Sequence, residues 1–198
     1  SRCRCVTRPA PSIIMATARR RASGGPSQSA SGSKTCSRTT LVAIALVTTD
    51  GVDAADDGDD EEVAWVNVGD SRVYLLRDGE LTQLSRDHSL VEDLRRGGQL
   101  SEEEAAVHPQ RNILTRALGI DTDVEVDSGA VLPFLGDRFL LCSDGIHQPS
   151  PAAVLGAALE ASTPGRAVGL LVEFVMRGPA RDNLSAVVVR QMPSGGRS

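Results

Sequence analysis

Hydrophobic and polar positions alternate along this chain in a way that predicts strands and helices. Residues 39–49 form a continuous run rich in β-branched side chains, which predicts a buried strand. Alternating or short apolar segments predict six more strands, at residues 63–67, 72–77, 80–84, 124–132, 138–143 and 184–190. Helical spacing predicts helices over 151–161 and 165–177. This order of elements favours an α+β fold with mostly antiparallel strands and helices packed on one sheet.

The periodicity changes between the early and late strands. Ser89 precedes an apolar-periodic stretch that ends at Gly97 and Gly98, which predicts a short helix. Ser101 and the glutamates after it have the pattern of a capping box, and they predict a second short helix that stops before Pro109. We therefore expect a helical insertion between the strands.

The two ends of the chain have the composition of tails. Residues 1–38 are rich in Arg, Ser, Ala, Gly and Pro, which predicts a flexible tail, and residues 192–198 form a second, short one. The N-terminal segment is also similar to an organellar transit peptide, and an ordinary basic tail is the alternative. One domain is then expected over residues 39–191. Because the chain begins with Ser, we expect it to be processed or incomplete at its N-terminus.

Charge and cysteine content exclude several classes of function. All 26 acidic residues lie after residue 49, and residues 50–62 are so acidic that they predict a solvated loop, although a calcium loop is an alternative reading. The acidic domain should repel nucleic acid and anionic membranes. The four cysteines have neither disulfide nor zinc spacing, so we expect a reducing compartment and a cytoplasmic location.

Three aspartates lie at the ends of predicted strands beside small residues. Asp70 lies in Val-Gly-Asp-Ser-Arg, Asp144 in Cys-Ser-Asp-Gly, and Asp182 in Arg-Asp-Asn. Carboxylates in such positions can approach a hard cation, although Asp beside Gly is also ordinary turn chemistry. The three histidines, at positions 88, 108 and 147, lie in polar segments and are expected to be satisfied turn and surface residues. Cys142 lies inside an apolar strand, so the sequence offers no nucleophilic triad.

Five blocks in order carry a resemblance to a known family. They are GDSRVYLLRDGELTQLSRDHSLV, HPQRNILTRALG, GDRFLLCSDG, a helical stretch and RDNLSAVVV, and the strand TTLVAIALV precedes them. Over about residues 38–190 the chain resembles the type 2C metal-dependent serine/threonine phosphatases, especially bacterial members. The resemblance implies two packed antiparallel sheets flanked by helices, in an α-β-β-α sandwich that is incomplete at the N-terminus.

The resemblance also implies a chemistry. Asp144 and Asp182 match metal ligands of the family, and Asp70 matches a position linked to a further, weaker metal site. The implied cofactors are Mg²⁺ or Mn²⁺, and a metal-bound water would hydrolyse phosphoserine or phosphothreonine. Residues 86–118 match the mobile flap beside the cleft. Expected partners are phosphorylated proteins and a serine/threonine kinase or its targets, and the chain is expected to be a monomer.

The chain also departs from the family pattern. The Arg that grips the substrate phosphate, the Glu-Asp pair and the Asp-Gly-Met-Gly-Gly motif have no match in the sequence, so no catalytic side chain is assigned. Three readings stay open. The chain is part of an active phosphatase, a truncated fragment or pseudophosphatase that acts as a binding module, or an unrelated domain that binds cations through its acidic loop.

Overall fold

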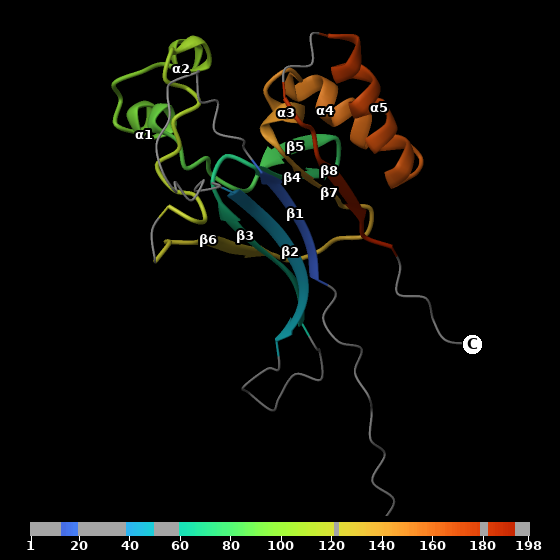
Figure 1. Cartoon of the computed structure of the whole chain (residues 1–198). Helices are drawn as coiled ribbons and strands as arrows, with labels where there is room; N and C mark the ends of the chain where they lie inside the picture. The colour runs from blue at the N-terminus through green and yellow to red at the C-terminus, as the bar shows by residue number, and fades with distance from the viewer. Residues whose placement is uncertain (1–12, 20–38, 50–59, 121–122, 179–181, 193–198) are drawn as a thin grey trace, which may run out of the picture.

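The predicted strands, together with one strand that was not predicted, pair into two antiparallel four-stranded sheets in the computed structural model of the chain (Figure 1). The structure describes residues 13–19, 39–49, 60–120, 123–178 and 182–192. Sheet A has the order β1 (Ile13–Arg19), β2 (Thr39–Thr49), β3 (Asp60–Val68) and β6 (Asp127–Val131). Sheet B has the order β5 (Glu80–Gln83), β4 (Arg72–Arg77), β7 (Arg138–Cys142) and β8 (Ala186–Arg190). Every neighbouring pair in these two sheets is antiparallel, as predicted.

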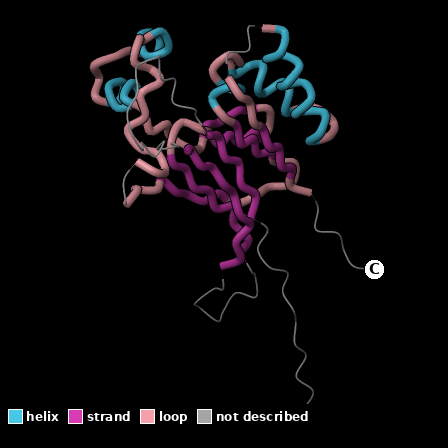
Figure 2. The backbone as a smooth tube through the Cα atoms, viewed as in Figure 1, coloured by secondary structure: helices cyan, strands magenta, loops and turns pink. Residues whose placement is uncertain are grey.

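The helices form two separate groups around the strands (Figure 2). The first group is α1 (Leu90–Arg96) and α2 (Glu102–Val107), both between β5 and β6 in the chain. The second is α3 (Asp144–His147), α4 (Ala152–Leu159) and α5 (Pro164–Arg177). None of the described helices combines the length and apolar character that crossing a membrane requires. The predicted class, two packed antiparallel sheets flanked by helices, is confirmed.

One apolar cluster fills the space between the two sheets. Val42, Ile44 and Val63 come from sheet A, and they pack against inward-facing side chains of sheet B. Those partners are Val73, Leu75, Phe139 and Leu141. Residues two apart on a strand share a face, so alternate positions of β4 and β7 build this layer.

A second apolar cluster lies between sheet B and the helices. The other positions of β4 and β7 face outward and meet Ile146 of α3 and the buried faces of α4 and α5. The members are Tyr74, Leu76, Leu140, Cys142, Ile146, Leu155, Ala158, Leu159, Ala167, Leu171 and Val175. Because sheet B is covered on both faces, its two central strands are continuously apolar rather than alternating.

The structure corrects four details of the sequence prediction. Residues 13–19 were assigned to a flexible tail, but they form β1, which pairs antiparallel with β2, and their β-branched and apolar residues suit an edge strand. Residues 60–62 were assigned to the acidic loop, but Asp60 pairs with Thr49 at the start of β3. Strand β6 is shorter than predicted, and α3 was not predicted. The rest of the acidic loop, 50–59, and the rest of both tails except Met192 lie outside the described residues.

An ion pair fastens the start of β7 to the end of β4. Arg77 Nε and Nη2 donate to the two carboxylate oxygens of Asp137, at 2.9 and 2.6 Å. Phe134 N–H donates to the same carboxylate at 2.8 Å. The side chain of Asp137 is 2% exposed. Burial alone would raise the pKa of Asp137, but the hydrogen bonds from Arg77 and Phe134 outweigh it and hold this pKa below its ordinary value.

We expect Asp137→Asn to lower the free energy of unfolding at pH 7 by about 1.5–3 kcal/mol, because it removes the charge-assisted bonds. The folded-state pKa of Asp137 is depressed, so its stabilisation is complete above the unfolded pKa and disappears as the pH falls through the folded value. The difference between variant and wild type should therefore shrink as the pH drops below about 4. Urea unfolding at several pH values measures this. The exposed Glu103→Gln is the control, and a pH-independent difference would contradict the assignment.

Candidate functional site

Asp70 is positioned by the sharp turn between β3 and β4. Gly69, which precedes it, has φ +107°, and a Cβ at this position would overlap the side chain of Thr40. Only glycine suits both the conformation and the space. The hydroxyl groups of Thr40 and Ser71 lie 2.9 Å apart on the other side of the turn. Asp70 is therefore held in a buried and rigid turn between the two sheets.

Asp144 and Asp182 are brought together by the pairing of β7 with β8. Asp144 begins α3 directly after β7, and Asp182 lies just before β8. Because the pair is antiparallel, the end of one strand meets the start of the other. Ser143 N–H donates to the Ser185 carbonyl, and Ser185 N–H donates to the Ser143 hydroxyl, both at 3.0 Å. These bonds fix the two segments against each other.

The two carboxylates have the same local geometry. Gly145 N–H donates to Asp144 Oδ1 at 2.9 Å, and Asn183 N–H donates to Asp182 Oδ1 at 2.8 Å. A Cβ on Gly145 would overlap the carbonyl oxygen of Asn183, so the backbones touch here. Asp144 is buried, whereas Asp182 is exposed. In each case a backbone N–H fixes one oxygen and so orients the carboxylate.

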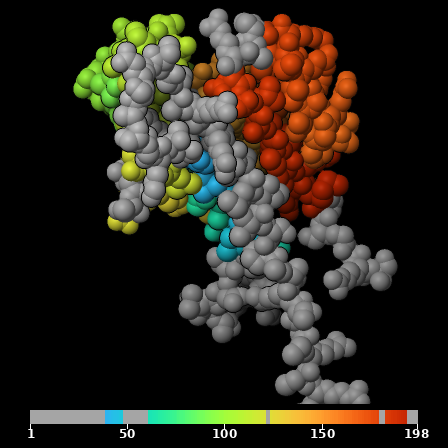
Figure 3. Space-filling view, viewed as in Figure 1, coloured from blue at the N-terminus to red at the C-terminus, as the bar shows by residue number. Residues whose placement is uncertain are grey.

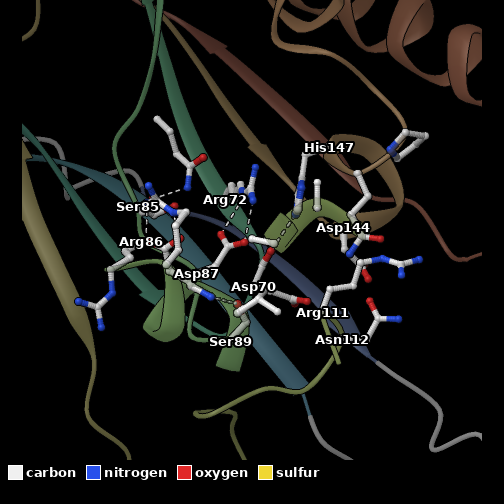
Figure 4. A pocket seen from close by; sticks show the side chains of 18 of the residues that line it. Asp70, Arg72, Ser85, Arg86, Asp87, Ser89, Arg111, Asn112, Asp144 and His147 are labelled. Carbon is white, nitrogen blue, oxygen red and sulfur yellow. Dashed lines mark hydrogen bonds and ion pairs between the residues drawn. The ribbon is translucent and has the colours of Figure 1, made fainter. Parts of the chain in front are cut away.

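One pocket of about 1140 Å³ is lined by all three aspartates. Its far wall comes from the segment 86–118, which contributes Ser89, Arg96, Glu102, Arg111 and Asn112 among others. Figure 4 shows Asp70, Asp144 and His147 around the same space as Arg111 and Asn112. In the space-filling view this segment, in green to yellow, and the helices α3–α5, in orange to red, gather on opposite sides (Figure 3). The structure thus brings the three predicted residues to one cleft.

An ion pair joins the pocket floor to the segment 86–118. The guanidinium of Arg72 donates to both carboxylate oxygens of Asp87, each at 2.7 Å, and to the Tyr74 hydroxyl at 2.9 Å. Burial disfavours the charge of Arg72, but the hydrogen bonds and charge of Asp87 outweigh it and raise the pKa of Arg72. Bidentate geometry fixes direction as well as distance, so β4 holds the start of this segment in place.

The carboxylates suit a hard divalent cation in chemical type, because such cations prefer oxygen ligands. However, within the part of the chain that the structure describes, no three His, Cys, Asp or Glu side chains converge in the manner of a metal site. Asp70, Asp144 and Asp182 share a pocket without forming such a group. A cation held by Asp144 and Asp182 would need further ligands beyond the described protein groups.

Two histidines differ from the sequence prediction. His88 and His147 were expected to be turn and surface residues, but both are buried. His147 Nε2 lies 2.9 Å from the Asp70 carbonyl oxygen, and since a carbonyl only accepts, the ring N–H donates. His88 contacts Gly69. His88 stands between Asp87 and Ser89, and His147 stands between Ile146 and Gln148, so no run of apolar residues marks either ring as buried. Cys142 is buried as predicted, and burial raises the pKa of its thiol to about 12.

Comparison with known proteins identifies relatives over part of this chain. No protein-family model matches it. The serine/threonine phosphatase Stp of Listeria innocua is 40% identical over 132 residues, which are 66% of this chain and 52% of that protein. The chain therefore spans about half the length of the curated relatives that it matches, or less.

Solved structures show the same similarity. The PPM Ser-Thr phosphatase MsPP from Mycobacterium smegmatis, in complex with cacodylate, is 37% identical with a TM-score of 0.68, and the match covers 80% of this chain and 64% of that chain. The catalytic domain of the serine/threonine protein phosphatase PstP, in complex with two manganese ions, is 31% identical with a TM-score of 0.58, covering 76% and 58%. These matches confirm the resemblance that the sequence blocks indicated.

We expect Gly145→Ala to lower the free energy of unfolding by about 1–3 kcal/mol, because the added methyl group forces Asn183 away from α3. Gly169→Ala is the matched control. It lies in α5 with open space around it, and it should be neutral or stabilising by up to about 1 kcal/mol. Urea unfolding of both variants tests the close approach. Equal stability of the two variants would contradict it.

Proposed function

Because the resemblance to bacterial type 2C serine/threonine phosphatases holds in both sequence and fold, we propose that this chain carries part of a metal-dependent protein phosphatase domain. The pocket would bind phosphoserine or phosphothreonine of protein substrates. The observation that carries the proposal is the meeting of three strand-end aspartates, Asp70, Asp144 and Asp182, in one cleft. A cleft of about 1140 Å³ also has room for a peptide segment around the phosphorylated side chain.

Asp144 and Asp182 are the residues that would hold Mg²⁺ or Mn²⁺, and Asp70 would contribute to a further, weaker site. A divalent cation supplies charge neutralisation at phosphoryl oxygens and lowers the pKa of water. The chain's own contribution is orientation. Gly145 and Asn183 N–H groups direct the two carboxylates, and the tight backbone contact keeps α3 against the start of β8. The manganese-bound structure of PstP supports a divalent cation in this fold.

The opposite wall of the pocket would hold the substrate. Arg96 and Arg111 of the segment 86–118 line the cleft across from the aspartates, and a guanidinium suits phosphate recognition. We propose that this segment is a flap that covers the bound phosphopeptide. The proposed partners are phosphorylated proteins, together with a serine/threonine kinase or its targets, and the chain would act as a monomer. A cytoplasmic location is proposed from the cysteine pattern.

A second candidate function is a binding module that recognises phosphoproteins without hydrolysing them. The observation in its favour is that the described residues form no three-ligand metal group. The sequence also has no match to the Asp-Gly-Met-Gly-Gly motif of the resembled family. A truncated fragment and a pseudophosphatase would both behave in this way.

We expect the 198-residue chain to bind Mn²⁺ weakly and to hydrolyse phosphothreonine peptides barely above background. Loss of ligand support at metal sites typically costs about 10–100-fold in affinity or activity, and loss of a direct ligand should cost more. Calorimetry with Mn²⁺ and release of phosphate from a phosphopeptide measure the two quantities. Asp144→Ala should abolish both signals, whereas the exposed Asp123→Ala should leave them unchanged.

Four outcomes separate the alternatives. Residual Mn²⁺-dependent turnover that vanishes in Asp144→Ala supports the enzyme. Binding of the phosphopeptide over its unphosphorylated form, without turnover, supports the binding module. Robust turnover of the wild type that depends on Asp144 would show that further residues of this chain supply ligands, and neither binding nor turnover would overturn both functions.

A further inference from the structure

His88 is the junction of three chain segments beneath the pocket. Its backbone N–H donates to the Gly69 carbonyl at 2.9 Å, and its own carbonyl accepts from Thr115 N–H at 2.9 Å. The side chain is fully buried and approaches Asp127, at the start of β6, with 3.0 Å between Nε2 and Oδ2. His88 therefore links the β3–β4 turn, the returning end of the segment 86–118 and sheet A.

The hydrogen bonds determine which ring nitrogen of His88 carries the proton. Gly69 N–H points to Nδ1 at 3.2 Å, and a backbone N–H only donates, so Nδ1 is the acceptor. The proton is then on Nε2, which donates to Asp127. Arg116 also lies 3.5 Å from Nε2, but both groups are donors, and its guanidinium instead donates to Asp127 Oδ1 at 3.0 Å.

Asp127 is suited to hold this tautomer. Partial burial alone would raise its pKa, but the hydrogen bond from His88, together with nearby basic side chains that include Arg116 and Arg86, outweighs it and keeps the pKa of Asp127 below its ordinary value. The carboxylate is thus ionised at neutral pH and accepts from Nε2–H and from Arg116 together. A charged acceptor makes the bond to His88 stronger than a neutral one would.

The position of Asp70 depends on the hydrogen bonds between His88 and Gly69. Both backbone polar groups of Gly69 bond to His88, and Asn67 Nδ2 donates to the same carbonyl at 3.3 Å. On the other side, His147 donates to the carbonyl of Asp70 itself. The turn is consequently fixed before and after the Asp70 side chain, which lines the pocket.

We propose that His88 is a positioning residue of the pocket. Its Nε2–H tautomer, anchored by Asp127, holds Gly69 and thereby sets where the Asp70 carboxylate stands. The inference rests on the proposed function only in the role given to Asp70, because the hydrogen-bond relay itself needs no ligand. His88 is not among the residues that line the pocket.

The first test is independent of any metal or activity. Nitrogen-15 NMR of the full wild-type chain should show His88 as the neutral Nε2–H tautomer at pH 7. A Nδ1–H tautomer or a charged ring would overturn the proposal. Hydrogen exchange of the Gly69 amide is the second readout, because it reports the bond to Nδ1 directly.

Two substitutions separate the two bonds of the ring. In His88→Asn, Oδ1 replaces Nδ1 and can still accept from Gly69, whereas in His88→Gln the side-chain amide reaches Asp127 but offers Gly69 no acceptor. We expect Gly69 exchange to accelerate about 5–10-fold in His88→Gln and to stay near wild type in His88→Asn. His108→Gln is the control, since in the described part of the chain the His108 ring bonds within the segment 86–118, where its Nδ1 accepts from Gln110 N–H. Equal exchange in all three variants would overturn the proposal.

Mn²⁺ titration then tests the consequence for Asp70. His88→Gln should weaken Mn²⁺ binding at the weaker site, to which Asp70 would contribute, about 10-fold or more, and this effect should disappear when Asp70→Asn is already present. An undiminished effect in the Asp70→Asn background would overturn the link between His88 and Asp70. If wild type binds no Mn²⁺, the proposed function fails, while the tautomer and the Gly69 exchange still decide the role of His88.

Discussion

The structure depends on burying β4 and β7 on both faces. Their inward side chains join sheet A, and their outward side chains join α3–α5, so each strand belongs to both apolar clusters. Buried apolar surface stabilises a fold by about 25 cal/mol per Å², so this double burial stabilises both layers at once. The charged side chains of Arg72, Arg77 and Asp137 therefore lie at or next to the ends of these strands, and the candidate site forms at one of these ends.

The site follows from how those strand ends are closed. Carboxylates near a buried core are costly unless local donors satisfy them. Asp144 and Asp182 each accept from the next backbone N–H, and Gly69 and Gly145 let the chain approach within distances that a Cβ would prevent. The glycines therefore contribute as much to the geometry as the aspartates do. Asp144 after β7 and Asp182 before β8 follow the same local rule, in which a carboxylate near a strand end lies beside a tight backbone contact.

Much of this could be read from the sequence because strand periodicity and turn residues are local signals. Strands β2 and β4 begin and end where the pattern predicts, and Asp70, Asp144 and Asp182 do line one pocket. The histidines were missed because burial of a polar side chain depends on partners distant in sequence, as with His88 and Asp127. Strand β1 was missed because its apolar stretch is short and gains stability only by pairing with β2. That the described residues form no three-ligand group is likewise a property of spatial arrangement, which no local motif reports.

The segment 86–118 illustrates how polar contacts substitute for a core. Neither α1 nor α2 buries a single residue, so this segment gains little from the hydrophobic effect. It is held at its ends instead, by the Arg72–Asp87 pair, by the bonds of His88 to Gly69 and Thr115, and by the bridge between Leu118 and Thr39. These contacts involve Gly69, Arg72 and Thr39, which are in or next to the turn that positions Asp70. The distance between the two walls of the cleft is therefore set by a few directional bonds rather than by packing, and such bonds fix geometry at little gain in stability. In a segment attached in this way, the middle, which carries α1 and α2, can move while the two ends stay bonded to the residues around Asp70.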